Sequence, residues 1–190
     1  MNDTRRWQRR ALALPIGDDQ VDFVFANGLI EHLADPGIAL AEFARVLKPD
    51  ALIAVRSPDW GTVMLEPRSV RLQLSIDLRN RWHRHSGGDP EAGRKLRALL
   101  AASGFLLIDG HVEADSGDDP RAMCKYMQRV LRDPALRELC EQQAWASAAE
   151  LEKMIAAWSR WSSSADAFVA TLWCYAIARA GAGALSQDTS

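Results

Sequence analysis

Two short apolar runs, at residues 21–26 (VDFVFA) and 51–55 (ALIAV), constrain the fold of this chain more than any other feature. A strand that is buried on both faces, as in a parallel sheet, has such a nearly continuous apolar sequence. Between the two runs, Asp35-Pro36 pairs an N-cap residue with a proline at the first helical position, and Pro49 lies where the helix must end. A strand, a helix and a strand in about 35 residues form a βαβ unit. The sequence therefore predicts an α/β protein.

Helix signals recur further along the chain. Asp89-Pro90, Asp119-Pro120 and Asp133-Pro134 each predict the start of a helix, and Ser147–Glu150 has the sequence of a capping box. The helix after the capping box has an apolar stripe that should face the core, formed by Leu151, Met154, Ile155, Trp158 and Trp161.

Further strands are expected over residues 105–108 and 168–178. Residues 70–82 fit two periods, since apolar residues alternate there and also recur every fourth position, at Val70, Leu74, Leu78 and Trp82. The helix-favouring residues of this segment support a helix. The expected architecture is a mostly parallel sheet of about four strands with flanking helices.

The composition excludes several classes of protein. Hydrophobic residues make up 48% of the 190 residues and charged residues 25%, as in an ordinary globular protein. The net charge of −2 does not suit a general nucleic-acid binder. No apolar run approaches the roughly 20 residues that cross a bilayer, so no membrane partner is expected. The three cysteines are widely spaced and form no CxxC pair, which favours reduced thiols and a cytoplasmic location.

Residues 11–61 carry several short motifs in a specific order. Leu14-Pro15 precedes the first strand, Val21–Val24 lies within it, Glu31–Pro36 follows it, and Arg45–Pro49 ends the next helix. In this order and spacing the stretch resembles the class I S-adenosylmethionine-dependent methyltransferases, in particular the group that includes the ubiquinone and menaquinone biosynthesis enzymes. The resemblance continues through a later Gly-Gly-Asp-Pro and Gly-Phe pattern. It implies a partial Rossmann-like methyltransferase fold.

The resemblance also implies a division of the chain. The family begins with a strand and a glycine-rich loop that cradles the cofactor, and those parts would lie before residue 11. No GxGxxG motif occurs in the sequence. Residues 11–180 are therefore expected to form the C-terminal part of a methyltransferase domain. Residues 1–10 are an unassigned segment, and residues 181–190 are expected to be a disordered tail.

Four candidate site residues follow from the resemblance. Ala11 and Leu12 match the segment that borders the adenine of the cofactor, and Asn27 matches a residue that contacts the cofactor. Asn27 is also expected at the carboxyl end of a strand, where open α/β sheets bind ligands. His32 would face the substrate with Glu31 and act as general base. The structural alternatives remain open: Asn27 as a turn cap, and His32 as a half-exposed helix residue. No metal site is expected.

The implied function is S-adenosylmethionine-dependent methyl transfer to a small-molecule acceptor, with weak cofactor binding by this chain alone. The alternative is a truncated, non-catalytic remnant that acts as an interaction module or as half of a split enzyme. The strand at residues 21–26 should have an unpaired edge and exposed phenylalanines, which predicts a homodimer, aggregation, or coverage by residues 1–10. A group of arginines is interpreted as a solvated helix face rather than an anionic-acceptor site: Arg68, Arg71, Arg79, Arg81, Arg84 and Arg94.

Overall fold

The computed structural model describes residues 11–116 and 119–181. The elements, in chain order, are β1 (Val21–Asn27), η1 (Ile30–His32), α2 (Pro36–Val46), β2 (Leu47–Glu66), α3 (Val70–His85), η2 (Gly93–Lys95), α4 (Leu96–Ala102), β3 (Phe105–Asp115), α5 (Pro120–Arg132), α6 (Pro134–Gln142), α7 (Ala148–Trp161) and β4 (Phe168–Ala180). They form two compact units. The sheet unit contains residues up to 61, 87–113 and those from 172 onward, and the helical unit contains 62–86 and 114–171.

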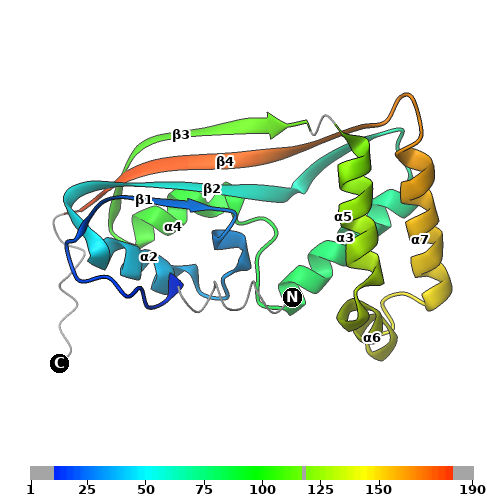
Figure 1. Cartoon of the computed structure of the whole chain (residues 1–190), viewed down its shortest axis with the longest axis horizontal. Helices are drawn as coiled ribbons and strands as arrows, with labels where there is room; N and C mark the ends of the chain where they lie inside the picture. Colours follow the sequence, from blue (N-terminus) through cyan, green and yellow to red (C-terminus); the bar gives the residue numbers. More distant parts are fainter. Residues whose placement is uncertain (1–10, 117–118, 182–190) are drawn as a thin grey trace. The chain divides into compact units, whose positions relative to one another are not determined.

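The four strands form one sheet in the order β1-β2-β4-β3. β1 and β2 are parallel, with Phe23 opposite Leu52 and Asn27 opposite Arg56. The chain direction in Figure 1 shows that β4 runs against β2 and β3. This order confirms the predicted Rossmann-like α/β fold with a four-stranded sheet and flanking helices, and adds that its last strand is antiparallel. Among the described residues, no helix is long and apolar enough to cross a membrane.

Helices α2 and α4 cover one face of the sheet unit and contact each other. α2 begins as the sequence predicts, because the Asp35 side chain accepts a hydrogen bond from the Gly37 amide at 2.9 Å. Its buried residues, including Leu40 and Phe43, pack with Ile53 of β2 in the core of this unit. α4 adds the buried Leu100 to the same core.

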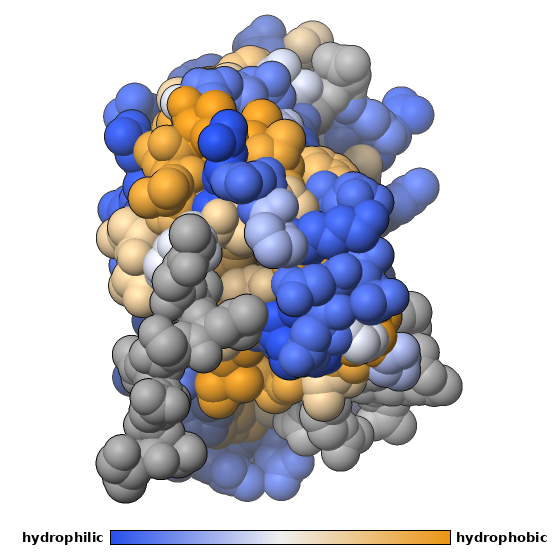
Figure 2. Space-filling view, turned by 90° about the vertical axis from the view of Figure 1, so that its left-hand side faces the viewer, coloured by the Kyte–Doolittle hydropathy of each residue, from blue (hydrophilic) through white to orange (hydrophobic). Residues whose placement is uncertain are grey.

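Several large apolar side chains of β1 and β3 are exposed to solvent. Phe23 and Phe25 on β1 are 53% and 60% exposed, and Leu106 and Ile108 on β3 are exposed as well. Figure 2 shows apolar patches between charged regions on the side of the molecule that it faces. The predicted exposure of the two phenylalanines and the edge position of β1 are thus confirmed among the described residues. Residues 1–10, which the sequence offered as a cover, lie outside the described residues.

The helical unit contains α3, α5, α6 and α7. The capping box at the start of α7 is present, with the Ser147 hydroxyl accepting from the Glu150 amide and the Glu150 carboxylate accepting from the Ser147 amide. The predicted stripe of α7 is buried, and Trp158 is completely so. Its indole N–H donates to the Ser75 hydroxyl of α3 at 2.8 Å. An indole can be fully buried without penalty only when its N–H is paired in this way.

Two predictions about helices were wrong in part. No helix begins at Asp89-Pro90, since the Asp89 amide donates to the Glu31 carbonyl and the Pro90 carbonyl accepts from Trp60, and the regular helix begins only at Leu96. Residues 70–85 are helical as predicted, but Val70 and Leu74 are exposed. The buried face of α3 is formed instead by Leu72, Ser75, Ile76, Leu78, Arg79 and Asn80.

The arginine group does not form one solvated face. Arg79 is buried, donating to the Tyr126 hydroxyl at 3.1 Å and to Asn80 at 3.0 Å. Arg81 lies 4.4 Å from the ring centroid of Trp145, and Arg94 forms an ion pair with Asp59. The interpretation of these residues as one solvated face is therefore wrong, because the fold gives each of these three arginines a separate partner.

Candidate functional site at the carboxyl end of β1

The turn after β1 gathers polar side chains of the sheet unit. Asn27 is the last residue of β1, and Gly28 follows with φ +62°, a left-handed conformation that glycine adopts without strain. The Gly28 amide donates to the Arg56 carbonyl at 2.9 Å, which ties the turn to β2. The chain then enters η1 directly, so Glu31 and His32 follow within five residues of the strand end.

Glu31 is a buried carboxylate beside a half-exposed imidazole. The Ser57 hydroxyl, buried on β2, donates to Glu31 Oε2 at 2.7 Å. His32 Nε2 lies 3.8 Å from Glu31 Oε1, within ion-pair distance. The Asp89 amide donates to the Glu31 carbonyl at 2.8 Å, so the backbone of this residue is also fixed. At this distance the carboxylate forms no hydrogen bond with Nε2, but it can stabilise a positive charge on the imidazole.

Arg56 lies among aromatic side chains across the strands. Its guanidinium carbon is 3.9 Å from the ring centroid of Trp173 and 5.1 Å from that of Tyr175, and its Nε donates to the Tyr175 hydroxyl. Its Nη1 makes a long contact of 3.4 Å with Asn27 Oδ1. Tyr175 in turn stacks on His111, with ring centroids 4.6 Å apart. The exposed Asn27 amide therefore adjoins a cation that is held in place by two rings.

The phenol of Tyr175 is a hydrogen-bonding group rather than a base. Burial raises its pKa above the ordinary value, and a hydrogen bond with Glu113 acts in the same direction, while the Arg56 cation opposes both. A phenol with a raised pKa remains protonated at neutral pH. It accepts from Arg56 and pairs with Glu113, which connects β2, β4 and β3 across this part of the sheet.

Asp59 is a second buried carboxylate, and its role is structural. Arg94 donates to both of its oxygens, at 2.5 and 2.8 Å, and the Gly61 amide donates to it at 3.0 Å. The same pairing raises the pKa of Arg94. A carboxylate whose oxygens are engaged by a bidentate arginine and a backbone amide is poorly suited to abstract a proton. Nearby, burial raises the pKa of the Cys174 thiol, which therefore stays protonated.

The structure brings together some of the predicted site residues. Asn27 and His32 share the turn after β1. Ala11 is buried in the same apolar cluster as Ala26, the neighbour of Asn27. Leu12 is exposed. In the described parts of the chain, no group of three or more His, Cys, Asp or Glu side chains could hold a metal ion.

Sequence reasoning missed the contribution of β2 and β4. Arg56 and Ser57 directly follow the apolar run 51–55, and polar residues at that point are the one local signal in the sequence, although β2 itself continues to Glu66. Trp173 and Tyr175 give no such signal. They alternate with small and apolar residues in a strand, and only the placement of β4 beside β2 brings them to Arg56.

Comparison with known proteins agrees with this architecture. Residues 4–55 match the family model described as a methyltransferase domain. An uncharacterized methyltransferase of Schizosaccharomyces pombe is 26% identical over 154 residues, which cover 78% of this chain and 54% of that protein. The O-methyltransferase resE of Aspergillus sclerotiorum is 26% identical over 120 residues, covering 63% of this chain and 41% of that protein.

A solved structure shows the same fold. The protein comes from Bacillus halodurans C-125 and carries a provisional methyltransferase name; it superposes with a TM-score of 0.53 at 14% identity, over 90% of this chain and 69% of that one. Over part of its length, the chain resembles methyltransferases. This methyltransferase-like chain spans about half or less of the length of the two curated relatives described above.

The residues of this site fit one part of the cofactor that the resemblance implies. The exposed Asn27 amide has one long contact, so its oxygen and its N–H groups are accessible to a polar ligand. The exposed rings of Phe23 and Phe25 lie on the same strand and offer an apolar surface.

Proposed function

We propose that this chain takes part in S-adenosylmethionine-dependent methyl transfer to a small-molecule acceptor, with His32 as general base. The observation that carries the proposal is the pair formed by His32 and the buried Glu31 at the carboxyl end of β1, within a methyltransferase-like fold. When bound, the cofactor supplies a methyl group that is already activated on a sulfonium. The protein then has mainly to align the acceptor and remove its proton.

In this mechanism each residue has a definite task. His32 Nδ1, the ring nitrogen that does not face Glu31, accepts the proton of the attacking group of the acceptor, and the Glu31 carboxylate beside Nε2 stabilises the imidazolium that results. Ser57 keeps the carboxylate oriented. Asn27, with the backbone of Ala11 and Leu12, contacts the cofactor. The relative named an O-methyltransferase supports an oxygen as the attacking atom, and the resemblance to quinone-biosynthesis enzymes supports a phenolic or quinol acceptor.

We further propose that residues 11–180 correspond to the C-terminal part of a methyltransferase domain. The three cysteines have no disulfide partner among the described residues, which is consistent with a cytoplasmic protein. A net charge of −2 and the described polar site favour a small molecule over nucleic acid as the partner.

A second candidate function is favoured by the open β1 edge and the exposed phenylalanines beside it. In that case the chain is a non-catalytic interaction module or half of a split enzyme, and the edge pairs with another polypeptide. A second copy of the chain is the simplest such partner, since an exposed strand edge pairs readily with its like.

Isothermal titration with S-adenosylmethionine tests the first function. The sequence has no glycine-rich loop, so the chain should bind S-adenosylmethionine at millimolar levels or not at all. The loss of the two or three polar contacts that such a loop region makes with the cofactor, at about 1–3 kcal/mol each, weakens binding by several powers of ten. A micromolar dissociation constant that Asn27→Ala abolishes would show a complete site in this chain. Reading the genomic DNA upstream of codon 1 for a glycine-rich strand-loop motif distinguishes a fragment from a short protein.

Turnover is the second test. At millimolar S-adenosylmethionine, which the expected weak binding requires, any release of S-adenosylhomocysteine with a panel of phenols and quinols should be lost in His32→Gln and reduced in Glu31→Gln. The matched control is His85→Gln, because that histidine lies in the helical unit, edge-on to Trp145. Full activity in His32→Gln would remove the proposed base.

A further inference from the structure

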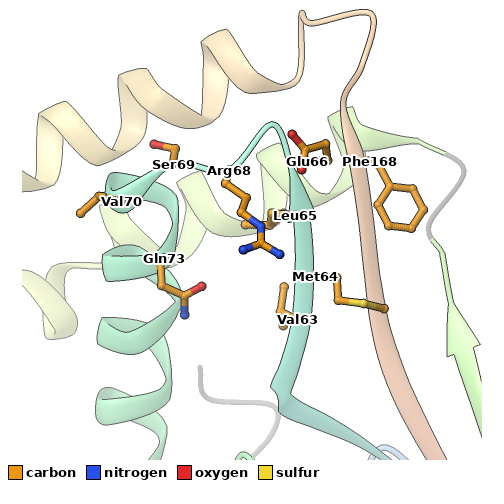
Figure 3. A pocket seen from close by; sticks show the side chains of 9 residues that line it. All are labelled: Val63, Met64, Leu65, Glu66, Arg68, Ser69, Val70, Gln73 and Phe168. Carbon is orange, nitrogen blue, oxygen red and sulfur yellow. The ribbon is translucent and has the colours of Figure 1, made fainter.

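A pocket of about 550 Å³ lies within the helical unit, apart from the residues discussed above (Figure 3). Its lining comes from four segments: the end of β2, the loop that follows it, the start of α3 and the first residue of β4. The lining residues are Val63, Met64, Leu65, Glu66, Arg68, Ser69, Val70, Gln73 and Phe168. This volume is within the range of pockets that hold small molecules.

The walls of the pocket are largely apolar. Met64 is 50% exposed, Val70 77% and Phe168 46%. Val63 and Leu65, the neighbours of Met64 in β2, are half-buried and pack against the core of the helical unit. Large apolar side chains that remain in contact with water around a hollow are typical of a ligand surface.

The frame of the pocket is fixed by the core. The Trp161 indole donates to the Glu66 carbonyl at 2.9 Å, which ties the end of β2 to α7. Trp158 of the same helix donates to Ser75 of α3. The two walls that β2 and α3 provide are therefore attached to one buried helix, so the pocket is preformed.

The polar groups of the pocket are unevenly distributed. Figure 3 shows the Arg68 side chain reaching along the pocket, with its guanidinium toward Gln73 and Met64, while the Glu66 carboxylate lies at the other end, near Phe168. Among the residues that the structure describes, the Arg68 guanidinium has no hydrogen-bond or ion-pair partner. The Gln73 side-chain N–H donates to Asp77 at 3.0 Å, which stabilises that end of the wall.

We propose that this pocket binds a small amphipathic carboxylate, with its apolar body along Met64 and Phe168 and its carboxylate on Arg68. Arginine recognises a carboxylate through two parallel N–H groups, and Arg68, which pairs with no carboxylate in residues 11–116 and 119–181, is available for that contact. The apolar walls supply most of the contact area, and the single cation gives the orientation. The proposal does not depend on methyl transfer in the sheet unit.

Three probes with the same apolar body separate the contributions: octanoate, 1-octanol and octyltrimethylammonium, each titrated into the full chain by calorimetry. Octanoate should bind most tightly. Arg68→Gln should weaken octanoate roughly ten-fold and leave octanol unchanged, since only a charge-assisted contact is lost. Phe168→Ala should weaken all three.

Arg71→Gln is the matched control, because Arg71 is an exposed arginine in the first turn of α3, three residues after Arg68, and does not line the pocket. Both arginines are exposed, so neither change should affect folding, which circular dichroism checks. Equal weakening by Arg68→Gln and Arg71→Gln would show a general charge effect and overturn the proposal. Tighter binding of the ammonium probe, or no saturable binding of octanoate, would overturn it as well.

Discussion

The guanidinium carbon of Arg56 lies 3.9 Å from the centroid of the Trp173 ring, so a cation of β2 is held against an aromatic side chain of the adjacent strand β4. A hydrogen bond to Tyr175 fixes the same guanidinium from a second direction. The contact joins residues that are far apart in the sequence, and it places a positive charge beside Asn27 at the carboxyl end of β1.

This contact should contribute measurably to stability. Cation–π pairs of partly exposed arginines are worth about 0.5–1 kcal/mol. A double-mutant cycle of Arg56→Met and Trp173→Leu in urea unfolding should therefore give a coupling energy of about that size. Arg179→Met is the control. Arg179 lies on the same strand as Trp173, and its Nη1 is 4.0 Å from Asp50 Oδ1. Coupling near zero would show that the stacking does not stabilise the sheet unit.

Trp158→Ala should be among the most destabilising single changes. The side chain is fully buried, and its removal leaves a large cavity and takes away the N–H that donates to the Ser75 hydroxyl oxygen. The expected loss is about 3–5 kcal/mol in urea unfolding. Trp158→Phe should lose less, because most of the volume is kept. Arg160→Ala, on the exposed face of the same helix, should change stability by less than about 0.5 kcal/mol. A loss below about 1 kcal/mol for Trp158→Ala would contradict the burial.

The ion pair between Glu42 and Arg45 should give a specific pH dependence. A hydrogen bond from Arg45 is the main cause that lowers the pKa of Glu42 below its ordinary value of 4.5, and the Leu14 amide donates to the same carboxylate at 2.7 Å. A carboxyl whose pKa is lower in the folded state stabilises the fold above the unfolded pKa. That contribution is lost as the pH falls through the folded pKa.

Glu42→Gln should therefore be less stable than the parent protein at pH 7. The difference in the free energy of unfolding should shrink as the pH is lowered below about 4.5. Asp109→Asn, an exposed carboxyl that accepts only from the adjacent Gly110 amide, is the control. A difference that stays constant from pH 7 to pH 3 would show that the charge of Glu42 has no role.

The open edge of β1 should govern self-association. If two copies pair through this strand, Phe25→Glu should shift the protein to the monomer in sedimentation velocity, because a buried charge would face the partner. Val112→Glu places the same charge on β3, at the opposite edge of the sheet, and should leave the oligomeric state unchanged. A parent protein that is a stable monomer with a protected 21–26 backbone in hydrogen exchange would exclude this interface.

The sequence by itself determined the local structure wherever a local rule operates. Asp-Pro pairs began α2, α5 and α6, the Ser147 capping box began α7, and the two apolar runs became adjacent parallel strands. Each of these helix starts and strands depends on residues a few positions apart, so its pattern can be recognised in the sequence. The motif order of residues 11–61 also led to the methyltransferase resemblance.

The tertiary structure alone decided which residues share a site. Asp89-Pro90 failed as a helix start because Glu31 and Trp60 take its backbone groups, and the α3 stripe differs because α7 packs against Ser75 and Leu72 rather than Val70. Arg56 meets Trp173 only because β4 is placed beside β2. Local sequence fixes hydrogen bonds and periodicity over one or two turns, whereas contacts between distant strands and helices depend on how the apolar faces are buried together.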